Sequence, residues 1–154
     1  MVRILVDGFS LLHGWPELAP RRARHSAAAR DELVHWLARY QDAVGTPVTV
    51  VFDGMGAPAG TPAVVSRPEM EVLYSRAGQT ADDVIERVVH RLLDYGEVVV
   101  VTDDNLERET VLSLGGHVKS CAVFIGDMKA ALGEMRGDLE QINRRERSEF
   151  RRPR

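Results

Sequence analysis

Short apolar runs alternate along this chain with longer segments whose apolar residues recur at helical spacing, a pattern that few folds accommodate. Residues 98–101 form the clearest run, because four consecutive valines suit a strand in the centre of a parallel sheet. Further strands are expected at 2–6, 48–52, 71–74 and, at an edge of the sheet, 117–120. Helices are expected at 26–44, from Thr80 to about 93, at 106–114 and at about 127–143. The pattern predicts a three-layer α/β/α sandwich with a mainly parallel central sheet.

The length and the cysteine content limit the organisation of the chain. Its 154 residues suit a single domain, which we expect at 1–143, followed by a basic tail at 144–154. Segment 54–68 is rich in Gly and Pro, and we expect an ordinary insertion there rather than a flap over a site. Cys121 is the only cysteine, so an internal disulfide is excluded and no cysteine cluster indicates zinc. No apolar run reaches membrane-spanning length, and we expect a soluble cytoplasmic protein.

Basic residues are concentrated in two segments, although the net charge of the chain is −3. One segment precedes the helix expected at 26–44, and the other closes the chain at 144–154. Such segregation suits a protein whose basic segments bind phosphates while an acidic pocket binds cations, but solvated surface explains either segment equally well. The first segment comprises Arg21, Arg22, Arg24, His25 and Arg30.

Aspartates follow the carboxyl ends of the expected strands. Asp7, Asp53 and the pair Asp103 and Asp104 each come directly after a strand, and a further acidic pair begins the helix at Thr80. The carboxyl ends of strands in an open parallel sheet line the crevice where ligands bind. Clustered carboxylates repel one another unless a cation lies between them, and hard ions such as Mg²⁺ or Mn²⁺ prefer oxygen ligands. We therefore expect a divalent metal site at this edge of the sheet.

Each of these acids also has an ordinary structural explanation. Asp82 and Asp83 suit the positive end of a helix dipole, and an Asp-Gly pair after a strand is common in turns. The interpretation as a site therefore depends on the recurrence of acids at equivalent strand ends rather than on any single residue.

Several motifs lie in a fixed order along the chain. The longest is the sequence ILVDGFSLLH at residues 4–13, followed by WPEL at 15–18. The others lie at 29–31, 40–41, 50–53, 74–75, 78–83, 85–86, 101–104 and Ser120. Together they resemble the YacP-like NYN-domain ribonucleases, a branch of the PIN-like superfamily, and the likeness extends over about residues 3–125.

The resemblance implies endoribonucleolytic cleavage of RNA that depends on Mg²⁺ or Mn²⁺. Some relatives cleave mRNA on the ribosome, which makes the ribosome an expected setting. It implies that Asp7, Asp82 and Asp104 hold the metal and that Asp53 and Asp83 support them. At Asp103 the family has a small hydroxyl residue, so this extra carboxylate either joins the metal ligands or faces solvent.

Substrate contacts are expected outside the metal ligands. Arg21, Arg22 and Arg24 would steer RNA toward the pocket, and Lys119 is a further candidate for a phosphate. Three residues with hydroxyl groups near the acids complete this set, namely Ser10, Thr80 and Thr102. Ser10 stands where the family has Asn, and a hydroxyl replaces only part of the hydrogen-bonding capacity of an amide.

Two other classes of function remain open. An RNA-binding or ribosome-binding module with weak catalysis would fit the departure at Ser10. A phosphoacceptor receiver-like domain would use Asp53, Thr102 and Lys119 but would give the acids at 82–83 no role. A dinucleotide-binding domain is not indicated because no GxGxxG follows the first strand, and a haloacid-dehalogenase-like phosphatase would need an acid where Phe9 stands.

Overall fold

The computed structural model describes residues 1–54, 64–66, 70–76 and 78–151, and its centre is a six-stranded sheet. The strands lie in the order β3-β4-β2-β1-β5-β6. All neighbouring pairs are parallel except β3 and β4, which run antiparallel. The strands are β1 (Val2–Asp7), β2 (Val48–Phe52), β3 (Val64–Ser66), β4 (Glu71–Tyr74), β5 (Glu97–Val101) and β6 (His117–Lys119). The mainly parallel sheet confirms the prediction.

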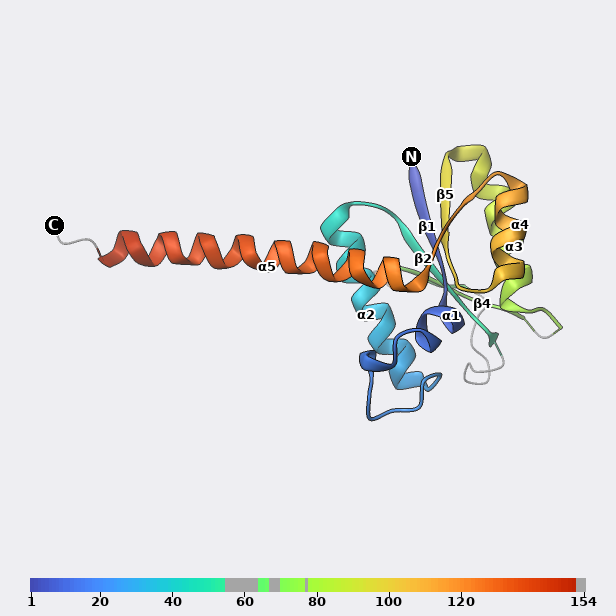
Figure 1. The fold of residues 1–154 in the computed structure, drawn as a ribbon, viewed down its shortest axis with the longest axis horizontal. Helices are drawn as coiled ribbons and strands as arrows, with labels where there is room; N and C mark the ends of the chain where they lie inside the picture. The colour runs from blue at the N-terminus through green and yellow to red at the C-terminus, as the bar shows by residue number, and fades with distance from the viewer. Residues whose placement is uncertain (55–63, 67–69, 77, 152–154) are drawn as a thin grey trace.

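Helices cover both faces of the sheet, as expected for an α/β/α sandwich (Figure 1). One core cluster joins α1, α2 and α5 to the sheet, and the second joins α3 and α4 to its other face. In β1, Ile4 and Val6 belong to the first cluster and Leu5 to the second, because successive strand residues point to opposite faces. The helices are α1 (Gly8–His13), α2 (Ala27–Val44), α3 (Ala81–Leu92), α4 (Asn105–Leu114) and α5 (Cys121–Arg151), with short 3-10 turns η1 (Pro16–Leu18) and η3 (Leu93–Tyr95).

The order of the strands creates a switch point beside β1. The chain adds β2 and β4 on one side of β1 and then crosses over to add β5 on the other side. Val6 pairs with Val50 on one neighbour and with Val101 on the other, so the residues that follow these strands emerge together. Crevices for ligands in open α/β sheets lie at such a switch point, outside the carboxyl ends of the strands.

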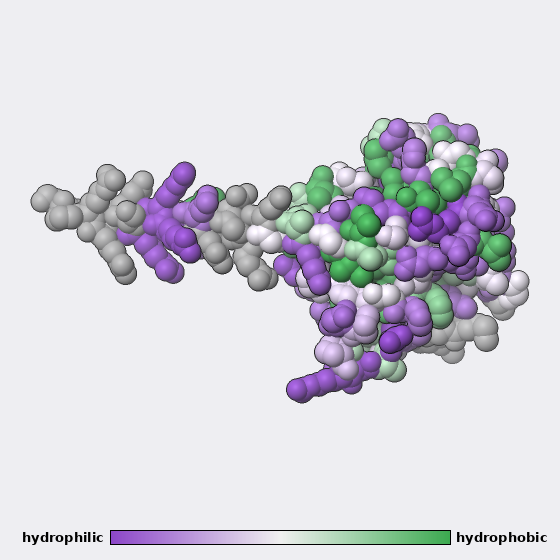
Figure 2. Space-filling view, viewed as in Figure 1, coloured by the Kyte–Doolittle hydropathy of each residue, from purple (hydrophilic) through white to green (hydrophobic). Residues whose placement is uncertain are grey.

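Helix α5 is longer than predicted at both ends. It begins at Cys121 and continues to Arg151, whereas the sequence pattern indicated about 127–143. Gly126 lowers local helix propensity but lies inside the helix, next to the buried Phe124 and Met128, which hold this part against the core. The C-terminal half extends away from the sheet (Figure 1), and its described side chains are exposed and, apart from Ile142, hydrophilic (Figure 2). The expected division at residue 143 falls within this helix and stays a prediction.

Two further elements were not expected from the sequence. Helix α1 follows β1 without a connecting loop, because Asp7 ends the strand and accepts a hydrogen bond from the Ser10 amide as the helix cap. Strand β3 lies within the segment that we had interpreted as an insertion, whose residues 55–63 are outside the described residues. Among the helices of the described residues, none has the length and apolar character needed to cross a membrane.

Candidate active site

A cavity of about 390 Å³ opens at the carboxyl edge of the sheet, at the switch point beside β1. Its acidic lining comes from loops and helix starts that are far apart in the sequence. Phe9, Ser10, His13, Thr80 and Ala81 complete the lining. The structure thus brings together five of the acids singled out in the sequence, namely Asp7, Asp53, Asp82, Asp103 and Asp104.

Asp7 is the buried acid of this cavity, with 4% of its surface exposed. Its Oδ1 accepts a hydrogen bond from the Ser10 amide at 3.3 Å, and its Oδ2 accepts one from Thr102 Oγ1 at 3.1 Å. Burial raises the pKa of Asp7 above its ordinary value, and these hydrogen bonds offset part of that rise. The Asp7 side chain is therefore fixed in place, although burial disfavours its charged form.

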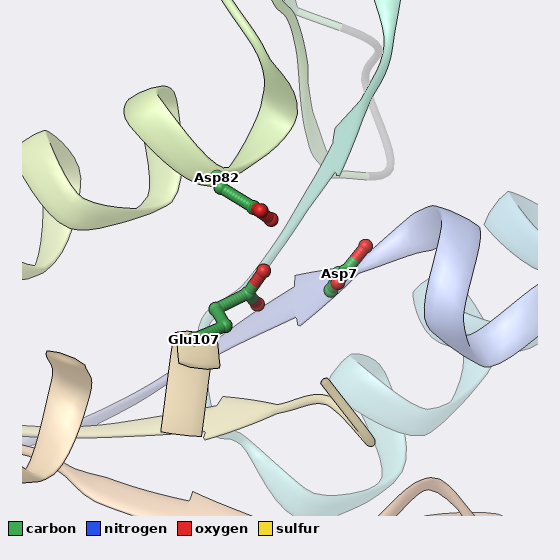
Figure 3. Close-up of side chains that lie close together, drawn as sticks. All are labelled: Asp7, Asp82 and Glu107. Carbon is green, nitrogen blue, oxygen red and sulfur yellow. The ribbon is translucent and has the colours of Figure 1, made fainter. Parts of the chain in front are cut away.

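Three carboxylates meet beside the cavity, and two of them, Asp7 and Asp82, line it. Oxygens of Asp7, Asp82 and Glu107 lie within 4.8 Å of one another, although the residues come from β1, α3 and α4. Figure 3 shows the three side chains turned toward one another. Asp82 is exposed to the cavity, whereas Asp7 and Glu107 are buried. This spacing would allow one cation to contact all three side chains.

Glu107 has the least favourable environment of the three acids. Only 5% of its surface is exposed, and neither carboxylate oxygen has a hydrogen-bond partner among the described residues. Burial, followed by the proximity of Asp82 and Asp7, raises the pKa of Glu107 to about 10. A buried carboxylate without donors is costly unless it is protonated or a cation lies beside it. The orphaned oxygens therefore fit a hard divalent ion, for which carboxylates are preferred ligands.

Glu107 was not predicted from the sequence, because it lies neither directly after a strand nor in an acidic pair. A signal was present: Glu107 lies one helical turn before Val111, which belongs to the core. An acid on the apolar face of a helix, three residues after Asp104, indicates a buried carboxylate near that strand end. The helical pattern of α4 could have identified it.

Asp104 and Asp103 line the cavity but do not belong to the group of three. Asp104 Oδ1 accepts hydrogen bonds from the amides of Leu106 and Glu107, at 3.0 and 3.2 Å, and so caps α4. Asp103 Oδ1 accepts a hydrogen bond from the Cys121 amide at 2.9 Å. Glu107, not Asp104, is the third acid of this group, and a metal-binding role for Asp103 or Asp104 stays a prediction.

Ser10 and Thr102 hold the acidic loops in position. Ser10 Oγ accepts a hydrogen bond from the Asp103 amide at 2.8 Å and lies at the cavity wall. Thr102 is fully buried, and its hydroxyl accepts a hydrogen bond from the Asp104 amide at 3.1 Å while it donates to Asp7. Thr102 is therefore positioned to orient Asp7 and the following loop, and its predicted contact with substrate stays a prediction.

The start of α3 is held by a reciprocal pair of hydrogen bonds. Thr80 Oγ1 accepts from the Asp83 amide at 3.2 Å, and Asp83 Oδ2 accepts from the Thr80 amide at 3.0 Å. This capping box fixes the first turn, which carries Asp82 into the cavity. Asp53 also lines the cavity, and its Oδ1 accepts a hydrogen bond from the Ser75 hydroxyl at 3.4 Å.

The predicted basic residues have different surroundings. Arg21 and Arg22 are exposed in the connection before α2, and Arg24 Nη1 lies 3.4 Å from His13 Nδ1 at the cavity. Lys119 forms an ion pair with Asp127, with 2.7 Å between Nζ and Oδ2. Because Lys119 is already paired with Asp127, it is less available to a phosphate. Arg21, Arg22 and Arg24, which we call the basic loop, are exposed and more accessible to a substrate than Lys119.

This fold and site define a class of protein: an α/β/α domain with a cavity lined by carboxylates at the switch point of its mainly parallel sheet. The family model described as YacP-like NYN domain matches residues 4–153, and the chain belongs to this family. Proteins with NYN domains are typically nucleases. This confirms the resemblance, and the fold is consistent with a PIN-like architecture.

Relatives from Bacillus subtilis match most of the chain. The sequence is 29% identical to a protein of strain 168 called "Uncharacterized protein YacP" over 127 residues, which are 82% of this chain and 74% of that protein. A crystal structure of Rae1 (YacP) matches with a TM-score of 0.80 and 25% identity, covering 96% of this chain and 85% of the other. A mutant of that protein matches with a TM-score of 0.76 and 27% identity, covering 93% and 84%.

Proposed function

We propose that this protein is a metal-dependent endoribonuclease that hydrolyses phosphodiester bonds of RNA. The observation that carries the proposal is the convergence of Asp7, Asp82 and Glu107 within 4.8 Å at an open cavity. Membership of a family whose members are typically nucleases supports the same activity. Asp7 and Asp82 both line this cavity, so a phosphate that enters it would meet two of the three acids.

The metal would be Mg²⁺ or Mn²⁺, held by Asp7, Asp82 and Glu107 directly or through water. A divalent cation at this position would neutralise charge on the scissile phosphate and make a water molecule more acidic. Asp7 is oriented for this role by Thr102 and by the Ser10 amide. Asp104 orients the first turn of α4, which carries Glu107. Asp53 and Asp103 also line the cavity, where they would hold waters or a second ion.

The substrate is RNA, and mRNA on the ribosome is the first setting to test, because the motifs at 4–13 and 78–83 resemble enzymes that act there. Arg21, Arg22 and Arg24 lie on the loop that precedes α2, close to the cavity through the contact of Arg24 with His13. Cations at this place would attract the phosphate backbone and raise the rate of encounter. A cytoplasmic location follows from this substrate.

A catalytically weak RNA-binding module is the second candidate, and Ser10 is the observation that favours it. Its oxygen accepts a hydrogen bond from the Asp103 amide, which leaves a substrate one acceptor site and the single O–H donor, fewer than the amide group of the family Asn offers. The receiver-like alternative loses support, because Lys119 is paired with Asp127 and Thr102 is buried.

A cleavage assay decides between enzyme and binder. Single-stranded and structured RNAs are incubated with the protein in Mg²⁺, in Mn²⁺ and in chelator, with Asp7→Asn, Asp82→Asn and Glu107→Gln as variants. Asp94→Asn is the matched control, because this exposed acid lies before β5, at the opposite edge of the sheet. We expect metal-dependent cleavage by the native protein and the control only. Cleavage that persists in chelator, or in all three site variants, would exclude the proposed mechanism.

A further inference from the structure

An exposed aromatic side chain stands at the mouth of the acidic cavity. Phe9 has 56% of its surface exposed, although it follows the buried Asp7 by only two residues. Phe9 and His13 both line the cavity together with the acids, and they lie one helical turn apart on α1. The proposed catalytic chemistry uses neither ring, so their presence at the cavity needs another explanation.

Three rings form an ordered stack at this place, which we call the aromatic column and define as Phe9, His13 and His25. The rings of Phe9 and His25 are parallel within 3°, with centroids 4.4 Å apart. The ring of His13 is also within 3° of the Phe9 plane, at a centroid distance of 6.1 Å. His25 comes from the loop before α2, so two separate segments of the chain contribute rings of one orientation.

The charge around the aromatic column suits a nucleotide. Arg24 Nη1 lies 3.4 Å from His13 Nδ1, and Arg24 is exposed. Partial burial, followed by the positive charges of His13, Arg24 and Arg30, lowers the pKa of His25 below its ordinary value. The lowered pKa favours the uncharged ring of His25, which suits stacking, while Arg24 supplies a cation at the edge of the aromatic column.

We propose that the aromatic column binds an unpaired nucleobase of single-stranded RNA, next to the phosphate held at the acidic cavity. This inference rests on the proposed function and specifies its substrate class. Proteins that recognise single-stranded RNA stack splayed bases on aromatic rings, whereas the bases of a duplex are already stacked and paired. A base placed against Phe9 and His13 extends a set of parallel rings, and Arg24 meets the phosphate of that nucleotide. Because stacking tolerates every base, the aromatic column selects unpaired RNA rather than a particular sequence.

The test measures stacking in a protein that leaves the RNA intact. A single-stranded RNA with one 2-aminopurine is titrated into the Asp7→Asn variant, with and without Phe9→Ala, and both fluorescence and anisotropy are recorded. We expect the single variant Asp7→Asn, which keeps Phe9, to quench the fluorescence of 2-aminopurine. The added Phe9→Ala should abolish the quenching and weaken binding about tenfold or more, since stacking of one base contributes on this order. Phe9→Trp should retain both signals.

Tyr95→Ala is the matched control, because Tyr95 is an aromatic residue that is 70% exposed before β5, at the opposite edge of the sheet. It should leave binding and quenching unchanged. His25→Ala provides a second variant on the other segment and should weaken quenching without affecting α1. Equal affinity and equal quenching with and without Phe9→Ala would overturn the proposal, as would equal affinity for the same RNA annealed to its complement.

A parallel cleavage assay separates failure of this inference from failure of the nuclease proposal. In Mg²⁺ or Mn²⁺, Phe9→Ala should cleave a single-stranded RNA more slowly than the native protein does. On an RNA with an abasic nucleotide at the stacked position, the two proteins should have equal cleavage rates. Cleavage that needs Asp7 but is indifferent to Phe9 would refute the aromatic column and leave the nuclease standing. Quenching that needs Phe9 without any cleavage would refute the nuclease and leave the aromatic column standing.

Discussion

Thr102 Oγ1 donates a hydrogen bond of 3.1 Å to Asp7 Oδ2, although the two residues are 95 positions apart in the chain. The contact joins the carboxyl end of β5 to that of β1, the two strands that flank the switch point. The same hydroxyl accepts a hydrogen bond from the Asp104 amide, and Asp104 in turn caps the helix that carries Glu107. One buried hydroxyl therefore links two of the three acids of the cluster through hydrogen bonds.

Thr102→Val tests this link. Valine keeps the shape of the side chain but removes the donor to Asp7 and the acceptor for the Asp104 amide. We expect the free energy of unfolding to fall by about 1–3 kcal/mol, because buried polar groups lose their partners. Metal-dependent cleavage should fall by about tenfold or more, as expected when a ligand loses the residue that orients it. Urea unfolding and cleavage rates measure the two effects, and Thr102→Ser should restore most of both. Full activity in Thr102→Val would show that Asp7 needs no such support.

Much of this arrangement followed from patterns that the sequence displays directly. The valines at 98–101 and the helical spacing of α2 predicted the layers, because strand and helix periodicities differ clearly. Asp7, Asp53 and Asp104 were expected at one edge, because parallel strands end together. The role of Glu107 was missed, because its importance depends on which neighbours α4 packs against rather than on a strand end.

Other differences arose from local preferences overridden by tertiary contacts. Gly126 lowers helix propensity, yet α5 continues through it, because Phe124 and Met128 pack against the core on either side. The aromatic column could not be predicted either, since it requires the loop carrying His25 to fold back onto Phe9. Contacts of this kind depend on tertiary structure that no spacing rule encodes.

Gly8, which directly follows Asp7, is expected to tolerate substitution poorly. A Cβ at this position would lie 2.4 Å from Phe52 Cδ1 and 2.9 Å from the Val51 carbonyl oxygen. Gly8→Ala should therefore destabilise the fold by about 1–3 kcal/mol through overpacking. Gly126→Ala is the matched control, because a Cβ there would meet nothing within 4 Å. Inside a helix, this control should stabilise by about 0.5–1 kcal/mol. Unfolding in urea compares the two, and equal stabilities would contradict the close approach of Gly8 to β2.

The raised pKa of Glu107 predicts a specific dependence of stability on pH in the absence of metal. The carboxyl has a pKa of about 10 in the fold, against an ordinary value of 4.5. Between these values the folded state binds a proton that the unfolded state has lost, so this group lowers stability as pH rises. The melting temperature in chelator should therefore fall from pH 5 to pH 9 more steeply for the native protein than for Glu107→Gln.

Addition of Mn²⁺ should reverse this loss of stability, because a cation favours the ionised carboxylates. The increase in melting temperature should be larger at pH 8 than at pH 6, since fewer protons are displaced at the higher pH. Glu107→Gln should show a smaller increase at both values. Parallel pH profiles for the native protein and Glu107→Gln in chelator would mean that Glu107 has an ordinary pKa.

The exposed arginines before α2 should contribute to RNA binding mainly through counterion release. We assume that Arg21 and Arg22 each neutralise one phosphate, which contributes about 0.7 to the slope of log K for RNA binding against log salt on a single strand. In the double alanine variant this slope should therefore become shallower by about 1.4. The change should be the same for RNAs of different sequence, because phosphate contacts carry no sequence information. Arg91→Ala serves as the matched control, because Arg91 is exposed near the end of α3, away from the capped first turn that faces the cavity. Fluorescence anisotropy between 50 and 200 mM salt would measure the slopes. An unchanged slope in the double variant would assign the basic loop to solvated surface and require RNA to approach the cavity from another side.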